Sequence, residues 1–235
     1  MELAAGVAKV SKWAVRESGD TLEVIERPHG GLSLVLADGQ GSGQAAKDLS
    51  NLVAKKAIGL LADGVRDGAV ARAAHDFLYH YRHGQVSATL NIVSADLVSR
   101  TLVVSRNNPC PAILVLNGEV ELLSEPSMPI GMHRRMKPVV VERPITPGLR
   151  LLVYTDGIES AGRRQSQRLD VLAEVRRLVA EHDASPLGLA EGLLDAAVRL
   201  DQGRPNDDMS VMALSVLPRD RDDLTRRMWI SFPIG

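Results

Sequence analysis

The stretch LSLVLADGQGSG, residues 32–43, decides the fold. Its first six residues, Leu32 to Ala37, form an apolar run that is typical of a buried strand. Asp38 follows that run, and glycines then alternate with polar residues up to Gly43, which indicates a sharp turn. Ser42 is a good N-cap, so we expect a long helix to begin there. The stretch therefore predicts a strand, a tight turn and a helix, with a carboxylate at the end of the strand.

The residues that follow predict one amphipathic helix. Apolar side chains recur at spacings of three or four and give a single stripe made of Ala46, Leu49, Val53, Ala57 and Leu60. Polar side chains occupy the other face: Gln44, Lys47, Asp48, Asn51 and Lys55. A second helix is predicted over residues 69–81.

The rest of the chain separates strands from helices. Strands are predicted before the stretch at 7–15 and 21–26, and after it at 88–93, 101–105, 112–116, 120–123, 138–142 and 150–154. Two more helices are predicted at 169–181 and 186–200, and a last strand at 210–217. Strands in blocks, with helices in pairs, indicate an α+β fold of antiparallel sheets covered by helices, and argue against a parallel βαβ array.

The composition narrows the class of protein. With 235 residues, of which 45% are hydrophobic and 24% charged, the chain suits one large domain or two small ones. A net charge of −1 and an aromatic content of 3% argue against nucleic-acid binding. We expect no membrane span and no signal peptide. The single cysteine, Cys110, fits a reducing cytoplasm.

Three further motifs place an aspartate at the end or the start of a strand-like run. They are SGD at 18–20, YTDG at 154–157 and NDDMS at 206–210. Each alone is a weak signal, because Asp-Gly often closes a strand and an acidic pair often lies on a surface. Together they bring Asp20, Asp156 and Asp207 to strand ends near Asp38. Converging carboxylates repel one another unless cations lie between them, so the motifs predict a hard-metal site with oxygen ligands.

Other interpretations of these motifs fit less well. A dinucleotide-binding turn needs glycine at position 44, which is Gln44, and no P-loop motif occurs. Cysteine-based phosphatase chemistry at Cys110 needs an arginine six positions later, where Leu116 stands. His80 and His83 have helical spacing, but no further ligands for a transition metal are evident. An Asp-Gly turn at Asp38 without any ligand role stays open as the plain structural alternative.

Taken in order, the motifs resemble a known family. The pattern comprises SGD at 18–20, DGQGSG at 38–43, SAT at 87–89, NP at 108–109, PIG at 129–131, TPG at 146–148, YTDG at 154–157 and DDMSV at 207–211. It looks like the metal-dependent serine/threonine protein phosphatases of type 2C (PPM), and more closely like their bacterial SpoIIE-like branch. In its small size the chain is similar to RsbX-type stress-pathway phosphatases.

The resemblance implies both a fold and a metal site. The fold is a four-layer αββα sandwich, in which two packed antiparallel sheets are flanked by helices, with two Mn²⁺ or Mg²⁺ ions in a cleft at one edge. By the match, Asp38 bridges both ions and the Gly39 carbonyl binds one of them. Asp156 and Asp207 hold the other ion, and Asp20 binds metal directly or through water. These residues are the catalytic and metal-binding residues that the resemblance implies.

The resemblance also implies a chemistry. A water that bridges two dications loses its proton near neutral pH and attacks phosphorus in line, without a covalent enzyme intermediate. Many eukaryotic members carry histidine where this chain has Gln40, so the general acid differs here. Arg16 is a candidate for holding the substrate phosphate, against an ordinary surface charge. Asp208 stands where relatives carry Asp or Asn, and we expect it to support the ligands without binding metal.

The expected function follows from the resemblance. We expect a cytoplasmic phosphatase that hydrolyses phosphoserine or phosphothreonine on a bacterial regulatory protein of a stress or sporulation-type switch. The alternative is a catalytically weak phosphatase-like module that binds a phosphoprotein partner, and a small phosphoester is a further candidate substrate. Residues 1–217 are predicted to form the phosphatase domain. Residues 218–235 are predicted to form a charged connector and a strand-like tail, which returns to the domain or to a partner.

Overall fold

The protein is built around two five-stranded sheets in which every neighbouring pair of strands is antiparallel. The computed structural model describes residues 1–181, 185–219, 224–231 and 233. The first sheet has the order β1 (Glu2–Val10), β10 (Met209–Leu217), β9 (Arg150–Tyr154), β6 (Ala112–Leu116) and β7 (Glu119–Leu123). The second has the order β2 (Asp20–Glu26), β3 (Gly31–Gly39), β4 (Ala88–Asp96), β5 (Thr101–Asn107) and β8 (Val139–Pro144).

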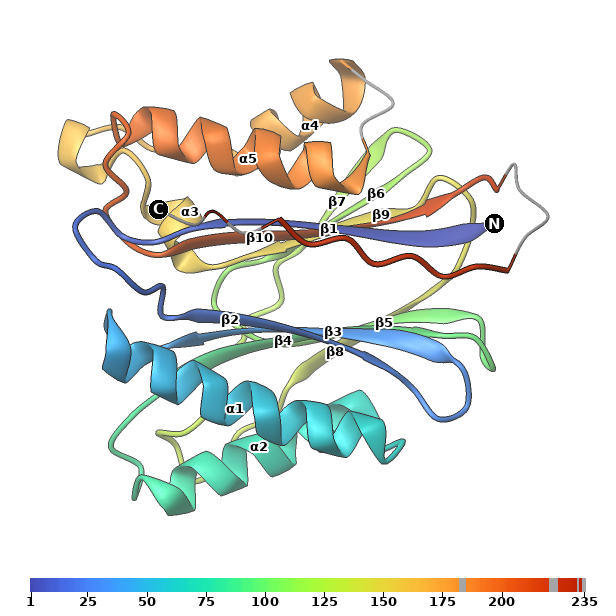
Figure 1. The fold of residues 1–235 in the computed structure, drawn as a ribbon, viewed down its shortest axis with the longest axis horizontal. Helices are drawn as coiled ribbons and strands as arrows, with labels where there is room; N and C mark the ends of the chain where they lie inside the picture. Colours follow the sequence, from blue (N-terminus) through green and yellow to red (C-terminus); the bar gives the residue numbers. More distant parts are fainter. Residues whose placement is uncertain (182–184, 220–223, 232, 234–235) are drawn as a thin grey trace.

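Helices cover the outer face of each sheet, as Figure 1 shows. The second sheet is covered by α1 (Gln44–Ala62) and α2 (Asp67–Tyr81). The first sheet is covered by α4 (Val171–Glu181) and α5 (Pro186–Leu200), with the short α3 (Asp156–Ser160) and a 3-10 turn (Arg163–Gln165) at one end. The α+β fold of four αββα layers is therefore confirmed.

The residues of β3 show how the layers are held together. Side chains alternate between the two faces of a strand. Leu34 and Leu36 pack between the sheets, whereas Val35 and Ala37 pack against the helices. All four are at most 1% exposed. Complete burial of a leucine or valine side chain contributes roughly 1.5–3 kcal/mol, so this strand stabilises both layers at once.

Two predicted boundaries near the N-terminus of the chain are wrong. The first strand is β1, Glu2–Val10, and not residues 7–15, because Val10 pairs with Met209 as the last pair of the ladder with β10. The chain then turns, with Ala14 at φ 62°. Helix α1 begins at Gln44, and its N-cap is Gly43 and not the predicted Ser42. Gly43 has a φ of 71°, a backbone conformation that favours glycine.

The C-terminal tail differs from its prediction as well. Residues 224–231 contain no strand. Leu224, Met228, Trp229 and Ile230 are exposed there, and Arg226 forms an ion pair with Glu26 of β2. Part of the charged connector, residues 220–223, lies outside the described residues. The domain boundary at residue 217 stays a prediction.

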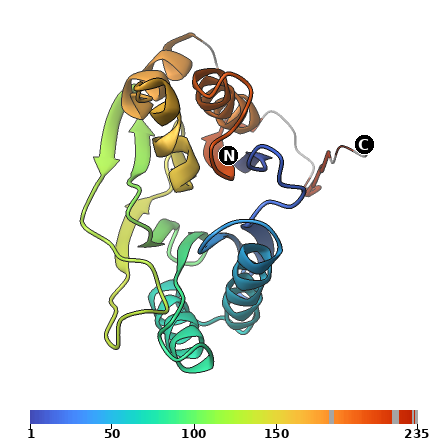
Figure 2. The same cartoon turned by 90° about the vertical axis from the view of Figure 1, so that its left-hand side faces the viewer.

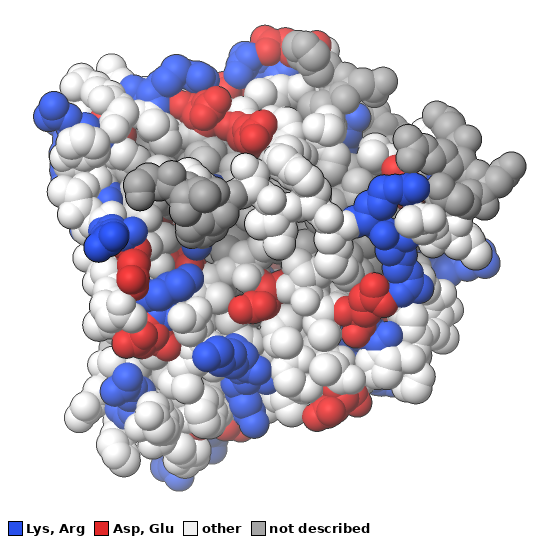
Figure 3. Space-filling view, viewed as in Figure 1, with Lys and Arg blue, Asp and Glu red and all other residues white. Residues whose placement is uncertain are grey.

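Charges are mixed over the face that Figure 3 draws. Lys and Arg side chains lie interspersed with Asp and Glu side chains there, in line with the net charge of −1. Within the described parts of the chain, no helix combines the length and the apolar character needed to cross a membrane.

Candidate active site

Two carboxylates of the second sheet face each other at one edge of the sandwich. Asp20 begins β2 and pairs directly with Asp38 near the end of β3. Leu22 and Leu36 each lie two residues from one of these aspartates and pack between the sheets. Because side chains alternate along a strand, both carboxylates lie on that inner face. Like charges directly opposite each other destabilise an antiparallel pair. The pairing of Asp20 with Asp38 therefore destabilises the folded protein when both carboxylates are charged.

Two more carboxylates come from the first sheet. Tyr154 ends β9, and Asp156 is the first residue of α3. Asp207 precedes β10, which lies beside β9 because Val211 pairs with Tyr154. The backbone N–H of Thr155 donates to the Ser210 carbonyl at 3.1 Å, which continues the pairing up to the motif. Figure 2 views the molecule from the end where α3 lies.

The four charges act on one another. Burial, together with the charges of Asp20, Asp156 and Asp207, raises the pKa of Asp38 to about 9. Burial raises the pKa of Asp156 too, together with the charge of Asp207, although the residue as a whole is exposed at the rim. Arg163 lowers the pKa of Asp156. The structure thus brings all four predicted aspartates into one electrostatic cluster.

Asp20 is held from the opposite sheet. Its Oδ2 accepts hydrogen bonds from Ser210 Oγ at 2.6 Å and from Thr155 Oγ1 at 3.0 Å. Thr155 is the N-cap of α3, but its side chain makes no capping bond and instead accepts from the Ser210 backbone N–H at 3.0 Å. Burial raises the pKa of Asp20 to about 6, and the two hydroxyls act in the opposite direction.

The second carboxylate oxygen of Asp20, Oδ1, indicates whether a metal ion would fit at this site. Asp20 is fully buried, and its Oδ1 has no hydrogen-bond partner among the described residues. A bare, buried carboxylate oxygen beside a repelling carboxylate is chemistry that suits a divalent cation. No group of three or more His, Cys, Asp or Glu side chains in the described chain converges closely enough to hold an ion alone. Ions at this edge therefore need backbone carbonyl and water ligands as well.

Asp208 has a different environment from its neighbour Asp207. Its Oδ1 accepts from the Lys12 backbone N–H at 2.9 Å and its Oδ2 from the Gly19 backbone N–H at 2.8 Å. Both oxygens are therefore engaged by the loop between β1 and β2. Asp208 fixes the segment that leads into Asp20 through these two backbone N–H groups, and its charge raises the pKa of Asp20.

The glycines beside the aspartates are required by close packing. A Cβ at Gly39 would lie 2.1 Å from the Ala46 carbonyl oxygen, and one at Gly157 would lie 2.1 Å from the Asp208 carbonyl oxygen. Any larger residue would push α1 or the segment before β10 away from the site. These contacts are why each Asp-Gly pair stands where it does.

Two lysines that no sequence motif singles out support the Asp20 backbone. Lys9 Nζ donates to the Asp20 carbonyl oxygen at 2.9 Å, and Lys47 Nζ donates to the same oxygen at 2.7 Å. Burial lowers the pKa of Lys9, and the charge of Lys47 lowers it further. Lys47 lies on the polar face predicted for its helix, so helical periodicity alone could not distinguish it from a solvated lysine.

The remaining candidates fall into two groups. Gln40 is tied to the start of β4, because its Oε1 accepts from the Ser87 backbone N–H at 2.9 Å and its own N–H donates to the Ser87 carbonyl at 3.1 Å. Arg16 is exposed in the loop before β2 and makes no hydrogen bond or ion pair within the described residues. The structure gives Arg16 no anchor at the cluster.

Asn108 is a positioning residue within a motif of the predicted pattern. Its Nδ2 donates to the Tyr154 carbonyl at 3.0 Å, so it holds the end of β9 just before Asp156. Its Oδ1 accepts from the Cys110 backbone N–H at 2.9 Å. Cys110 is 2% exposed, and burial raises the pKa of its thiol, as expected for a cysteine that packs. His80 and His83 are exposed and belong to no metal-holding group in the described chain.

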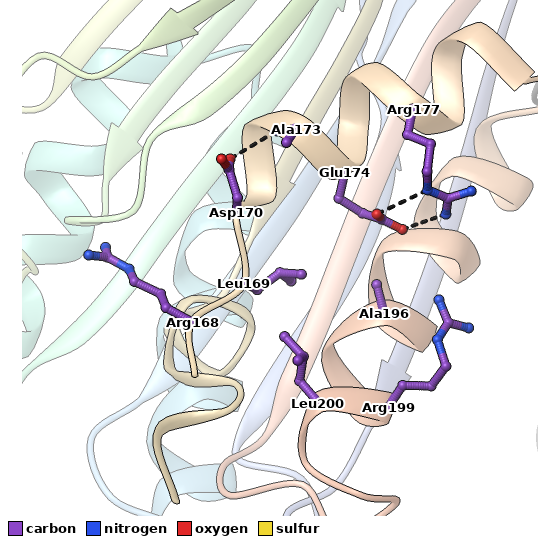
Figure 4. A pocket seen from close by; sticks show the side chains of 9 residues that line it. All are labelled: Arg168, Leu169, Asp170, Ala173, Glu174, Arg177, Ala196, Arg199 and Leu200. Carbon is purple, nitrogen blue, oxygen red and sulfur yellow. Dashed lines mark hydrogen bonds and ion pairs between the residues drawn. The ribbon is translucent and has the colours of Figure 1, made fainter. Parts of the chain in front are cut away.

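A separate hollow lies between α4 and α5, as Figure 4 shows. None of the four clustered aspartates lines it. Arg177 is bound to Glu174 at 2.6 Å within the same helix, and Asp170 accepts from the Ala173 backbone N–H at 2.9 Å. These contacts are typical of a helix surface, and the acidic cluster is the better candidate for a catalytic site.

Comparison with solved structures shows the same fold. The PP2C phosphatase domain of SpoIIE from Bacillus subtilis, solved with a fragment of its regulatory domain, is 21% identical with a TM-score of 0.77. The match covers 92% of this chain and 64% of that chain, so the present chain spans less than two thirds of it. RsbX in complex with magnesium is 15% identical with a TM-score of 0.68, covering 90% of this chain and 94% of that one.

A third similar structure contains the RsbU and RsbW domains of a Mycobacterium tuberculosis protein. It is 21% identical with a TM-score of 0.71, and the match covers 91% of this chain and 59% of that chain. No curated protein matches the chain in sequence. The family model for Stage II sporulation protein E matches residues 28–217, which is most of the chain. The chain therefore belongs to the family of Stage II sporulation protein E (SpoIIE), and it has the fold of the PP2C phosphatase domain.

Proposed function

We propose that this protein hydrolyses phosphoserine or phosphothreonine on a bacterial regulatory protein with the help of divalent metal ions. The observation that carries the proposal is the direct pairing of Asp20 with Asp38 across β2 and β3, with the buried Asp20 Oδ1 left without a partner among the described residues. Burial and the neighbouring carboxylates raise the pKa of Asp38 to about 9 at this position. An acidic cluster of this kind is stable near neutral pH when cations lie within it. Membership of the SpoIIE family supports the same class of reaction.

We assign the proposed ligands residue by residue to two Mn²⁺ or Mg²⁺ ions. Asp38 would serve as a ligand of both ions, the Gly39 carbonyl as a ligand of one, and Asp156 and Asp207 would hold the other. Asp20 contributes its unpartnered Oδ1 directly or through a water. When bound, such ions supply the charge that lowers the pKa of a water and neutralises phosphoryl oxygens.

The chain's own residues have three tasks in this proposal. Ser210 and Thr155 orient the Asp20 carboxylate by hydrogen bonds to its Oδ2. Asp208 fixes the loop before Asp20 through two backbone N–H groups. Gln40 holds the glycine turn against Ser87. An amide does not transfer protons near neutral pH, so Gln40 would not act as the general acid.

The proposed partner is a phosphorylated regulatory protein of a stress or sporulation-type switch in the cytoplasm. Similar folds in SpoIIE and in the RsbU and RsbX proteins support this class of partner by analogy. The partner itself can be found by capture on the Asp38→Asn protein, followed by mapping of phosphorylated sites in what is retained.

Turnover by the purified full chain tests the proposal. We expect p-nitrophenyl phosphate and a phosphothreonine peptide to be hydrolysed with Mn²⁺, and hydrolysis to stop when EDTA is added. Asp38→Asn should reduce kcat by several orders of magnitude, while Asp48→Asn, on the exposed face of α1, should leave it unchanged. Full activity in EDTA would contradict the metal-dependent mechanism. Binding of a phosphopeptide with no turnover would instead support the phosphoprotein-binding alternative.

A further inference from the structure

Two segments of the chain contain no acidic residues and carry exposed arginine, lysine and histidine side chains. Residues 77–95 and 126–141 contain no Asp or Glu, in a chain that has 29 acidic and 28 basic residues overall. We call their cationic part the basic surface; it comprises Arg82, Arg134, Arg135 and Lys137, with the histidines His80, His83 and His133. The charge bias of these two segments matters for binding only if the segments meet in space.

The fold places the two segments side by side. Ala88 and Ile130 form an isolated antiparallel bridge, with N···O distances of 3.1 and 2.9 Å. The Gly131 backbone N–H donates to His75 Nδ1 of α2 at 3.1 Å. A Cβ at Gly84 would lie 3.4 Å from the Met132 carbonyl oxygen, so the end of α2 and the loop at 132 are in contact. The basic residues therefore share one region of the surface.

The cations of the basic surface are accessible. Arg82, Arg134, Arg135 and Lys137 are all exposed. None of the four pairs with an acidic side chain in the described chain, in contrast to Arg177 and Arg143 elsewhere. Arg82 lies over the Tyr81 ring at 5.3 Å. Tyr81 is 58% exposed and Met132 is 48% exposed, which adds apolar contact area to the charges.

The basic surface borders the acidic cluster. Ser87, between the two, is bonded to Gln40 in the glycine turn. Two residues later Thr89 pairs with Asp38 across β4 and β3. A substrate that places its phosphorylated side chain at the acidic cluster would therefore bring its neighbouring residues close to this surface. Because the cluster is acidic, an acidic substrate would be repelled unless nearby basic residues attract it.

We propose that the basic surface binds an acidic segment that flanks the phosphorylated residue of the substrate protein. The proposal rests on the proposed function for the position of the phosphorylated side chain, and on charge complementarity for the choice of partner. Interactions of exposed charges act chiefly on the rate of association and weaken as salt is added. The basic surface would thus select acidic substrates through KM and leave the chemical step unchanged.

Binding and turnover of matched peptides test the proposal separately. One fluorescent phosphothreonine peptide carries glutamates on one flank, and its partner carries glutamines at the same positions. Fluorescence anisotropy in EDTA measures binding without turnover, and kcat/KM with Mn²⁺ measures catalysis. In low salt we expect the wild type to favour the glutamate peptide by about tenfold in both measurements, and the preference to decline with added salt.

Charge reversal locates the effect. Arg134→Glu combined with Arg135→Glu should remove the preference while leaving turnover of p-nitrophenyl phosphate unchanged. The control combines Arg100→Glu, in the turn between β4 and β5, with Arg176→Glu on α4; it makes the same change in charge away from the cleft and should keep the preference. Thermal melting checks that both proteins fold.

Three results have distinct meanings. Equal binding of the two peptides by the wild type, or a preference that survives Arg134→Glu with Arg135→Glu, would overturn the proposal. Displacement of the glutamate peptide by a single-stranded RNA at equal concentration would also overturn it, in favour of a nucleic-acid partner. Absence of p-nitrophenyl phosphate turnover by the wild type would overturn the proposed function alone, because anisotropy in EDTA still reports on the basic surface.

Discussion

Ser210 and Asp20 join the two sheets at the acidic edge, because Ser210 Oγ in β10 donates to Asp20 Oδ2 in β2 at 2.6 Å. A hydrogen bond to the charged form of a carboxyl favours that form. The bond therefore both orients Asp20 and opposes the burial that raises its pKa to about 6. Its removal offers a sensitive test of the site.

Ser210→Ala should raise the pKa of Asp20 and weaken Mn²⁺ activation. Loss of a partner to a buried carboxylate costs about 1–3 kcal/mol of stability. The activity at a series of Mn²⁺ concentrations and the melting temperature measure both effects. Ser215→Ala is the matched control, since Ser215 is also fully buried in β10 but its hydroxyl has no partner in the described chain. Similar behaviour of the two variants would show that the Asp20 contact is unimportant.

Asp38→Asn should stabilise the metal-free protein at neutral and alkaline pH. The folded-state pKa of Asp38 is raised from 3.8 to about 9, so its contribution to stability is complete below about pH 4 and is lost as pH rises to about 9. Melting curves in EDTA should show the wild type losing stability over this window more steeply than the variant. Parallel pH profiles for the two proteins would contradict the shifted pKa.

Mn²⁺ should raise the melting temperature of the wild type in a concentration-dependent way. A ligand that binds only the folded state stabilises it by RT ln(1 + [L]/Kd). Asp38→Asn should reduce this shift strongly, whereas Asp48→Asn should not, because Asp48 contacts Gln44 on the exposed face of α1. An undiminished shift with Asp38→Asn would mean that the ions bind elsewhere.

Arg163→Gln should move the acid limb of the pH–rate profile to higher pH. The charge of Arg163 lowers the pKa of Asp156, so its removal raises that pKa and leaves more of the carboxyl protonated at low pH. Arg164→Gln is the control from the same 3-10 turn, because Arg163, and not Arg164, is among the main causes of the shifted pKa of Asp156. Identical kcat/KM profiles for Arg163→Gln and Arg164→Gln would refute this role.

Gly39→Ala should destabilise the fold, because its Cβ would meet the Ala46 carbonyl at 2.1 Å. Overpacking of this kind costs typically about 1–3 kcal/mol. Gly59→Ala, at a helical position with open space around it, should stabilise α1 by up to about 1 kcal/mol. Chemical denaturation of both variants measures the difference, and equal stabilities would rule out the close contact.

Local sequence predicted the limits of elements correctly where turn or capping residues mark their ends. β6 and β9 have the predicted limits, and α5 begins at Pro186 after the capping Ser185, whose Oγ accepts from the Gly188 backbone N–H at 3.1 Å. The first strand was misplaced, because apolar spacing up to Val15 looked like a strand. Its true limit depends on β10, a partner about 200 residues away. Pairing over such a distance leaves no local signal.

The sequence by itself determined the strand–turn–helix at 32–43 and the aspartates at four strand ends, because alternation, glycine and side-chain chemistry act locally. Tertiary structure alone decided that Ser210 and Thr155 hold Asp20, and that Lys9 and Lys47 meet at one carbonyl. It also brought the segment after α2 into contact with the loop at 130–132. These contacts join different sheets, helices and loops, and the distance between such groups is set by packing of the layers, which no short window of sequence encodes.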